Sequence, residues 1–375
     1  MSARVVFIHG RPGPHPFHAS LARSLGAESL PVDFLLRWHD RPSSRLRRYM
    51  SWIICSLFFP RRSQYNVFLT EGPHFLPLIM RRLGLLDRRQ RVVALMANET
   101  LYFLKTARYS RPTRLALLEA LRACDALICI GRMQATLAGE TLLSSRRAPL
   151  VLTVRSGVAR DRQEALVRVE PSLDGRALLF VGNGPSGWRG WYKGLDLLLH
   201  ATALAASRVT GVSLSVVGEW DRAYVDELLS ALPVRPARVD LLGRRADLRP
   251  VLAESSLYVH LGRGEAFGIS VLEAMCAGVP ALVSEWTGAR EVVEQVDSRL
   301  VVPLDAAIAA ERICWYLNLP TAEKAALSAR AREVATGYPE DRAIREFVSG
   351  FRDLLTQFAL PDLSSPAVET YGREN

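Results

Sequence analysis

The stretch 257–278 constrains the fold more than any other part of the chain. Its first five residues, Leu-Tyr-Val-His-Leu, are rich in β-formers and predict a short strand. A glycine-rich turn follows over 262–268, and apolar residues at helical spacing over 269–276 predict a helix that stops near Gly278. A strand, a turn and a helix N-terminus direct free backbone N–H groups and the positive end of a helix dipole at one point. The stretch therefore predicts an α/β fold with an anion site, suited to a phosphate or a sugar diphosphate.

Two carboxylates, Glu265 and Glu273, lie in this stretch. Glu265 precedes the predicted helix and Glu273 lies about a turn inside it. We expect Glu273 to face the same site, where its carboxylate can accept hydrogen bonds from vicinal hydroxyls such as those of a ribose. The alternative is a helix start in an ordinary α/β domain, with Glu265 as a solvated first-turn acid.

Glu265, Phe267, Gly268 and Glu273, followed by Ala-Met-Cys-Ala-Gly-Val-Pro at 274–280, resemble the signature of retaining glycosyltransferases of family four, which have the GT-B fold. The resemblance implies that Glu265 lies beside the donor sugar and that Glu273 binds the ribose of the nucleotide. It also implies an α/β fold of two Rossmann-like domains that face a central cleft. A C-terminal helix would then cross back to the first domain.

The length of 375 residues allows two domains, each with its own core. Predicted strands and helices alternate through both halves, and the turn Ser-Gly-Val at 156–158 resembles the end of the first domain in the family. The predicted divisions are an acceptor-binding Rossmann-like domain 1–158, a linker 159–175, a nucleotide-sugar-binding Rossmann-like domain 176–340, a returning helix 341–360 and a disordered tail 361–375.

A second cluster follows the predicted strand 177–182. The loop after this strand carries Asn183, Gly184 and Arg189 and ends at Lys193, where the next helix begins. In the resembled family an arginine and a lysine of this loop hold the donor diphosphate, and Lys193 falls on the lysine position. Asn183 falls on the arginine position, and Arg189 can replace that arginine because a guanidinium binds phosphate with two hydrogen bonds. A solvated helix start is the alternative for Lys193, although a lysine there opposes the helix dipole. The predicted donor-binding residues are Lys193, Arg189, Asn183, Gly184, Phe267, Gly268, Ile269, Glu273 and Arg244.

The first predicted strand ends in a loop that carries Gly10, Gly13 and His15. A strand, a glycine-containing loop and a helix begin a Rossmann-like half. The resemblance implies that this loop approaches the acceptor or the donor diphosphate. His9, His15 and His18 are candidates for acid–base chemistry, with the alternative that each is a bystander in a loop.

Many relatives carry a histidine in the loop after a central strand, where this chain has Asn98 and Glu99. A carboxylate in a partly dry site can act as a base, so Glu99 is expected to polarise the acceptor hydroxyl. The alternative for Glu99 is a helix-capping acid. The predicted catalytic residues are Glu265, Glu99 and Asn98.

The net charge of +10 indicates an acidic partner or surface. The segment 45–62 contains an apolar run with arginines at both ends, too short to span a bilayer. It predicts either an interfacial membrane contact or a core helix with basic flanks. The sequence has no zinc-finger, helix-turn-helix or RNA-binding pattern, so nucleic acid is not an expected partner.

Together these patterns and the resemblance predict a glycosyltransferase that moves a sugar from a nucleotide diphosphate-sugar to a hydroxyl of a glycan or lipid-linked acceptor, without a cofactor. The resemblance implies that the anomeric configuration is retained, as in the family. No Asp-X-Asp metal motif occurs, so Lys193, Arg189 and backbone N–H groups are expected to neutralise the diphosphate without a metal. The alternatives are a nucleotide-sugar 2-epimerase of the same fold and a non-catalytic sugar-nucleotide-binding subunit. Five cysteines without metal spacing and no visible signal peptide predict a cytoplasmic protein that can lie at the inner face of the cell membrane.

Overall fold

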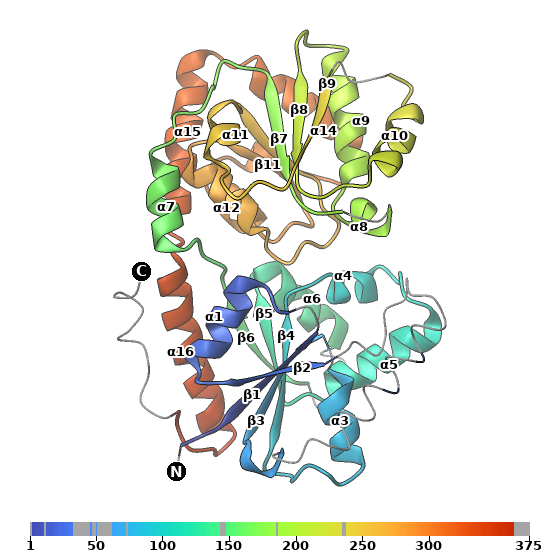
Figure 1. The fold of residues 1–375 in the computed structure, drawn as a ribbon, viewed down its shortest axis with the longest axis vertical. Coiled ribbons are helices and arrows are strands. Elements are labelled where there is room, and N and C mark those ends of the chain that lie inside the picture. The colour runs from blue at the N-terminus through green and yellow to red at the C-terminus, as the bar shows by residue number, and fades with distance from the viewer. Residues whose placement is uncertain are drawn as a thin grey trace. The chain divides into compact units, whose positions relative to one another are not determined.

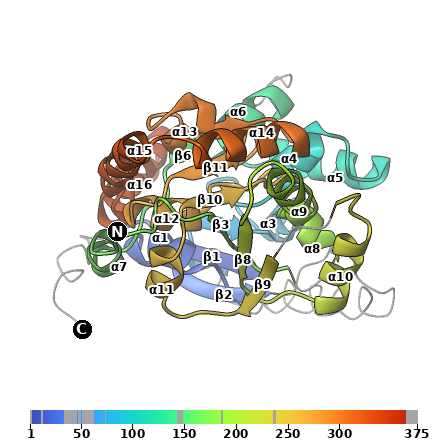
Figure 2. The ribbon, with the colours of Figure 1, turned by 90° about the horizontal axis from the view of Figure 1, so that it is seen from above.

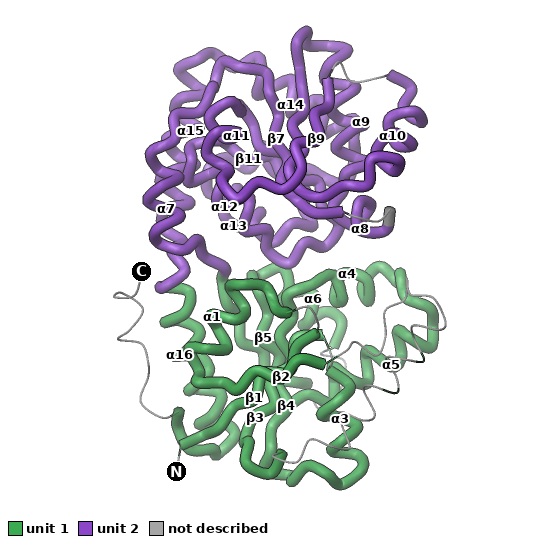
Figure 3. The backbone as a smooth tube through the Cα atoms, in the orientation of Figure 1, with its two compact units in different colours: residues 1–155, 342–375 green, residues 156–341 purple. Residues whose placement is uncertain are grey.

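The computed structural model describes residues 2–10, 13–32, 46, 50, 62–72, 74–142, 148–184, 187–234 and 238–363. The chain divides into two compact units, one made of residues 1–155 and 342–375 and the other of residues 156–341 (Figure 3). We call them unit 1 and unit 2. The chain therefore leaves unit 1 once and returns to it near its C-terminus, as the sequence predicted.

Unit 1 is a six-stranded parallel sheet in the order β2-β1-β3-β4-β5-β6, with helices between the strands (Figure 1). Its strands are β1 (Val5–Gly10), β2 (Glu28–Val32), β3 (Val67–Glu71), β4 (Arg91–Met96), β5 (Ala126–Ile130) and β6 (Leu150–Val154). Its helices are α1 (Pro16–Ser24), α3 (Phe75–Arg82), α4 (Thr100–Lys105), α5 (Arg111–Arg122), α6 (Arg132–Leu142) and α16 (Glu340–Gln357), with a short 3-10 helix, η1 (Arg62–Gln64). The central strands are almost continuous apolar runs because helices cover a parallel sheet on both faces.

The order of strands in unit 1 reverses between β1 and β3. The chain moves from β1 outward to β2, and then from β3 in the opposite direction to β6. Right-handed crossovers therefore place α1 on one face of the sheet and α3 on the other. In such a sheet the point of reversal is where the carboxyl ends of two neighbouring strands open a crevice for a ligand.

Unit 2 is a second six-stranded parallel sheet, in the order β12-β11-β10-β7-β8-β9. Its strands are β7 (Ala177–Val181), β8 (Ser213–Val217), β9 (Arg238–Gly243), β10 (Leu257–His260), β11 (Ala281–Ser284) and β12 (Val301–Val302). Its helices are α7 (Arg160–Val167), α8 (Gly187–Tyr192), α9 (Leu195–Ala206), α10 (Arg222–Ser230), α11 (Arg249–Ala253), α12 (Ile269–Cys276), α13 (Arg290–Val293), α14 (Ala306–Leu317) and α15 (Thr321–Thr336), with a 3-10 turn, η2 (Ser298–Leu300).

The sheet of unit 2 has the strand order of a dinucleotide-binding Rossmann fold, counted from β7 as the first strand. Its reversal lies between β7 and β10. Helix α9 packs against α14, and α12 packs against α15 and α7 (Figure 2). Because the crossovers through α9 and α12 run in opposite directions from the reversal, right-handedness puts these two helices on opposite faces.

Helix α16 completes unit 1. Its buried side chains recur at helical spacing and form one apolar stripe: Ala343, Ile344, Phe347, Val348, Phe351, Leu354 and Leu355. Gly350 faces β6 so closely that a Cβ there would lie 2.4 Å from a methyl carbon of Leu152. Just after the helix, the carbonyl of Phe358 accepts a hydrogen bond of 3.4 Å from Arg91 of β4.

The expected linker 159–175 contains helix α7, and the whole segment lies in unit 2. Only Leu166 of this helix is buried, so its polar sequence carries little apolar periodicity. The turn at 156–158 also belongs to unit 2, where Val158 pairs with Pro339.

The first residues of the expected disordered tail, 361–363, have a defined structure. Ala3 donates a backbone hydrogen bond of 2.8 Å to Asp362, and Leu363 is buried beside it. Residues 364–375 lie outside the described residues, and so does the segment 45–62 apart from Leu46, Met50 and Arg62. Among the described cysteines none is paired, and those at 124, 129 and 276 are buried.

Candidate active site

The ammonium of Lys193 donates a hydrogen bond to the carboxylate of Glu265 in unit 2. Lys193 follows helix α8, in the connection that leaves β7, and Glu265 lies in the turn after β10. Since β7 and β10 are the two strands that flank the reversal, the pair lies at the crevice where open α/β sheets bind ligands. The structure thus brings together two predicted site residues that are far apart in the sequence.

Burial and neighbouring charges compete at Glu265. Burial alone would raise the pKa of this carboxyl, but Lys193 and then His260 favour the charged form and lower the pKa to about 2. The Nε2 atom of His260 lies 3.8 Å from the Glu265 carboxylate. Burial lowers the pKa of His260 to about 4, because the ring loses its hydration and Lys193 opposes a second positive charge. At neutral pH the cluster is therefore one carboxylate, one ammonium and one neutral imidazole.

Arg263 links two segments of the site, the turn that contains Glu265 and the segment that contains Lys193. Its guanidinium makes two parallel hydrogen bonds to Asp196 of α9, at 2.7 and 2.8 Å. The same group lies over the ring of Trp191, 4.7 Å from the ring centroid. The bidentate pair and the cation–π contact together restrain both segments, so the position of Lys193 relative to Glu265 is fixed.

Glu273 faces α7. It is the fifth residue of α12 and is buried, and its Oε1 lies 2.5 Å from the Nε of Arg162. Burial raises the pKa of Glu273, and Arg162 opposes that rise. Nearby, the hydroxyls of Tyr258 and Ser270 are 2.8 Å apart, which ties β10 to the first turn of α12.

The motif residues between the two glutamates form the turn itself. Phe267 is buried, and its carbonyl accepts a hydrogen bond of 2.7 Å from the backbone of Ala289. Gly268 is the N-cap of α12 with φ 91°, a conformation that favours glycine, and Ile269 is the first helical residue. The turn is therefore shaped as the sequence predicted.

Arg189 and Asn183 are linked to each other. The Nε of Arg189 donates to the carbonyl of Asn183 at 3.2 Å, and Arg189 is close enough for its charge to lower the pKa of Glu265. The side chain of Asn183 accepts from the backbone of Glu219 at 2.9 Å, and Gly184 pairs with Trp220. These contacts join the loop after β7 to the loop after β8. Arg244 lies 3.7 Å from Glu219 on the exposed edge of the same region.

The predicted residues of unit 1 have local structural partners. Asn98 caps α4, because its Oδ1 accepts from the backbone of Thr100 at 3.1 Å. Glu99 occupies the N-cap position without a side-chain capping bond, and its charge contributes to the raised pKa of Tyr109 after the larger effect of burial. The capping residue is thus Asn98, where the sequence offered Glu99.

Gly10, Gly13 and His15 surround the carboxyl end of β1. The carbonyl of Gly10 accepts from Nδ1 of His9 at 3.0 Å, and Gly13 has open space around it. His15 is the N-cap of α1, and its Nδ1 accepts from the backbone of Phe17 at 3.3 Å. His15 therefore has a defined structural role at the start of α1.

Several residues of the candidate site were not singled out from the sequence: His260, Arg263, Asp196, Arg162, Tyr258 and Ser270. A histidine inside an otherwise apolar strand was a usable signal for His260. The local sequence around Arg162 or Asp196 does not predict a role in the site, because each residue contributes only through its contact with a residue on a distant element.

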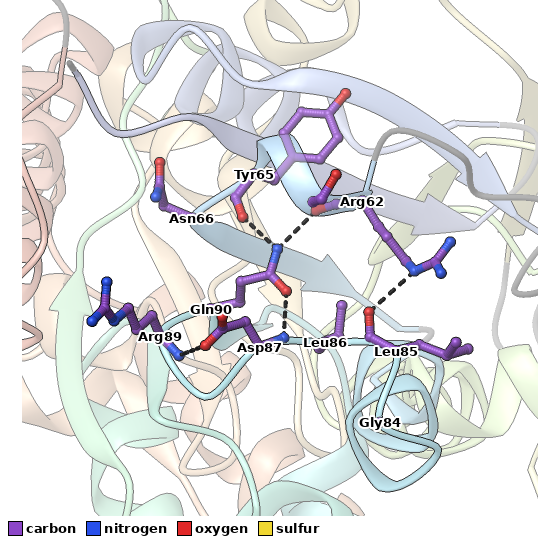
Figure 4. A pocket seen from close by; sticks show the side chains of 10 residues that line it. Arg62, Tyr65, Asn66, Gly84, Leu85, Leu86, Asp87, Arg89 and Gln90 are labelled. Carbon is purple, nitrogen blue, oxygen red and sulfur yellow. Dashed lines mark hydrogen bonds between the residues drawn. The ribbon is translucent and has the colours of Figure 1, made fainter.

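A polar pocket of unit 1, of about 580 Å³, lies at the amino ends of β3 and β4, away from the carboxyl ends of the strands. Gln90 lies at its centre (Figure 4), where its amide donates to the carbonyls of Arg62 and Tyr65 and accepts from the backbone of Asp87. None of the predicted site residues lines this pocket.

Within the described ranges, no group of three or more histidine, cysteine or carboxylate side chains could hold a metal ion. The described helices also include none that is long and apolar enough to cross a membrane.

The family described as "Glycosyl transferases group 1" matches residues 175–318, which contain Lys193, Glu265 and Glu273. Unit 2 carries a group 1 glycosyltransferase domain. The crystal structure of Anabaena HepE in complex with UDP and glucose resembles the chain with a TM-score of 0.65 at 18% identity, over 94% of this chain and 100% of HepE. The two units together have the GT-B fold of that protein.

Two curated relatives are similar to part of the chain. A phosphatidyl-myo-inositol mannosyltransferase of Mycolicibacterium smegmatis is 33% identical over 138 residues, 36% of this chain and 34% of the relative. A GDP-mannose:cellobiosyl-diphosphopolyprenol alpha-mannosyltransferase of Komagataeibacter xylinus is 26% identical over 181 residues, 47% of this chain and 46% of the relative. The chain spans between a third and a half of the length of these relatives.

Proposed function

We propose that the protein is a retaining, metal-independent glycosyltransferase that uses a nucleotide diphosphate-sugar as donor. The observation that carries this proposal is the Lys193–Glu265 pair at the reversal between β7 and β10. A cation and a carboxylate at one crevice match the two ends of such a donor. The ammonium suits the diphosphate, and the carboxylate suits the hydroxyls of the sugar.

Donor binding would exchange the partners of this pair. The diphosphate takes the ammonium of Lys193, and Arg189 adds a second cation from the preceding helix. Glu265, released from Lys193, then accepts hydrogen bonds from hydroxyls of the sugar. Glu273, one turn further along α12, accepts from the ribose hydroxyls in the same way.

In the transfer step the bond between the anomeric carbon and the diphosphate oxygen breaks, and its electron pair stays on the diphosphate. The acceptor oxygen bonds to the anomeric carbon on the same face, and its proton passes to the leaving diphosphate. Negative charge develops on the diphosphate, so stabilisation there by Lys193 and Arg189 is the largest catalytic contribution we assign to this chain.

The acceptor we propose is a hydroxyl of a glycan or of a lipid-linked sugar or polyol. Both curated relatives are named for acceptors of this kind, one a phosphatidyl-inositol and the other a diphosphopolyprenol-linked glycan. The net charge of +10 favours the approach of unit 1 or unit 2 to an anionic surface. We therefore place the reaction at the cytoplasmic face of a membrane, with the segment 45–62 as the proposed contact.

A thermal-shift screen of nucleotide diphosphate-sugars tests the donor assignment. A ligand that binds only the folded state raises the melting temperature by mass action, so one base and one sugar should stand out. The shift should disappear in Lys193→Ala and persist in Lys105→Ala, which removes a lysine from an exposed ion pair with Glu140. A panel without any shift would overturn the proposal.

The products separate the remaining alternatives. Incubation with the selected donor and a mixture of hydroxylated acceptors should release the free nucleoside diphosphate together with a glycosylated product. Recovery of a 2-epimerised donor would identify an epimerase. Tight donor binding without any turnover would identify a binding subunit.

A further inference from the structure

A histidine–carboxylate pair lies at the reversal of the sheet in unit 1. Strands β1 and β3 flank this reversal, and the register places His9 of β1 directly opposite Glu71 of β3, at the carboxyl ends of both. The Nδ1 of His18, on the first turns of α1, lies 2.8 Å from Oε1 of Glu71. The crevice at such a reversal is the ordinary ligand position of an open α/β sheet, and the site of unit 2 occupies the corresponding place.

The pair fixes the tautomer of His18. A carboxylate oxygen accepts, so the Nδ1 of His18 carries the hydrogen and donates it. The Nε2 of the neutral ring is then an acceptor. No hydrogen bond from any described residue reaches this Nε2 atom. The side chain is 10% exposed, and that of Glu71 is 20% exposed.

Glu71 has a second acceptor in the same place. Its Oε2 is buried and has no hydrogen-bond partner among the described residues. Buried carboxylate oxygens normally have a partner, and an exception calls for an explanation. A hydroxyl of a bound ligand would supply the missing donor.

Neither His9 nor His74 is hydrogen-bonded to a carboxylate of a described residue. His9 donates through Nδ1 to the carbonyl of Gly10, and its Nε2 lies 2.8 Å from Oγ of Ser29. The Nδ1 of His74 lies 2.8 Å from Oγ1 of Thr70, and burial lowers the pKa of His74 to about 4. His18 is thus the histidine of this cluster that a carboxylate orients.

The chemistry of the pair selects its ligand. His18 Nε2 and Glu71 Oε2 are both acceptors, and Glu71 is negative, so the ligand must supply hydrogen-bond donors. A phosphodiester supplies no donor, and any phosphate anion is repelled by the carboxylate. A polyol or a sugar supplies several hydroxyls in one small volume. The two reversals of this protein therefore differ, one being cationic at Lys193 and Arg189 and the other rich in acceptors.

We propose that His18 and Glu71 form the binding site for the hydroxylated headgroup of the acceptor, with Glu71 as the residue that orients His18. This assignment rests on the proposed glycosyl transfer for the word acceptor, while the polyol site itself can be tested without any transfer. It moves the acceptor-binding role from the predicted residue His15, which caps α1, to His18 one turn further on.

The test uses the full chain labelled with 15N in its histidine rings. His18 is identified by comparison with His18→Phe, and the protein is titrated with myo-inositol, methyl α-mannoside, methyl α-glucoside and, separately, inorganic phosphate. We expect a hydroxylated probe to shift the His18 ring signals and phosphate to leave them in place. In Glu71→Gln we expect at least a tenfold rise in the dissociation constant of that probe.

Two controls separate this site from the donor site. Glu140→Gln removes a carboxylate of unit 1 from an exposed ion pair, and His200→Gln removes a histidine on α9 of unit 2. Both should keep the affinity for the probe. In all variants the donor found by thermal shift should bind within twofold of the wild-type affinity, which also shows that the variants are folded.

Titration of the wild-type protein decides the matter even if a variant fails to fold. An absence of any His18 shift with all three hydroxylated probes would overturn the proposal, and so would equal shifts with phosphate. Unchanged probe affinity in a folded Glu71→Gln would overturn it too. A polyol shift without any donor binding would keep the site and remove the glycosyltransferase function.

Discussion

Lys193 and Glu265 form an ion pair across 72 residues of sequence, and each side chain is only about one-seventh exposed, at 14% and 15%. Removing one partner of a buried pair leaves an uncompensated charge, which costs about 3–5 kcal/mol. The stability of unit 2 and the binding of a donor therefore depend on the same two side chains.

We expect Lys193→Met to lower the free energy of unfolding by about 3 kcal/mol in the absence of donor, because Glu265 stays buried and charged. The double variant Lys193→Met/Glu265→Gln removes both charges and should regain most of that loss. Urea unfolding at pH 7 measures both values. If the double variant is as unstable as the single one, the cost arises from lost packing instead of an unpaired charge.

Stability should fall in acid because of Glu265. Its pKa is lowered to about 2 in the folded chain, whereas an unfolded glutamate titrates at about 4.3. The stabilisation is thus complete above the unfolded pKa and is lost as the pH falls from there toward 2. Glu265→Gln should show a shallower decline of the unfolding free energy between pH 5 and 3 than the wild type or the exposed control Glu140→Gln. Parallel declines in all three would contradict the assignment.

The conformation at Gly194 should be required for the donor site. Gly194 has φ 76°, and a Cβ there would lie 1.9 Å from the carbonyl oxygen of Leu261, so Gly194→Ala forces apart the segments that carry Lys193 and Glu265. Gly243 has φ 67° with no atom within 4 Å of its Cβ position, which makes Gly243→Ala a matched control for backbone strain alone. We expect Gly243→Ala to cost about 1 kcal/mol and Gly194→Ala at least twice as much. Donor affinity, measured by calorimetry, should fall at least tenfold in Gly194→Ala only.

The contact between Arg162 and Glu273 should set the pH range of donor binding. Burial raises the pKa of Glu273 and Arg162 opposes the rise, so Arg162→Ala moves the pKa further up. A protonated Glu273 accepts ribose hydroxyls less well. We expect the donor affinity of Arg162→Ala to be near the wild-type value at pH 8 and to fall at a higher pH than in the wild type as the solution is acidified. A pH profile that coincides with the wild-type profile would exclude this role for Arg162.

Local patterns were sufficient for most of the fold and for the residues of the glutamate motif. Strand β10 and helix α12 lie at the predicted positions, because the run of β-formers from 257 and the apolar spacing over 269–276 are clear signals. Helix α8 was predicted as part of a loop, since its sequence Gly-Trp-Arg-Gly-Trp-Tyr is short and contains two glycines. Helix α7 was read as linker for the related reason that it buries a single side chain.

Pairing between distant residues was the part that sequence could not supply. Lys193 and Glu265 were each predicted, but their contact follows from the placement of β7 beside β10, which only the folded sheet defines. The His18–Glu71 contact likewise joins residues 53 positions apart through the register of β1 and β3. Local sequence patterns predict candidate site residues, whereas the order of the strands determines which of these residues are in contact.

The return of the chain through α16 has a consequence for biosynthesis. Unit 2 is an uninterrupted segment, whereas unit 1 is discontinuous and receives its last helix only after the whole of unit 2 has been made. The apolar stripe of α16, from Ala343 to Leu355, has its place on a sheet completed about 190 residues earlier, at Val154. Synthesis of unit 1 therefore begins before that of unit 2 and ends after it. A nascent chain released before α16 is made would expose the face of the N-terminal sheet that α16 covers.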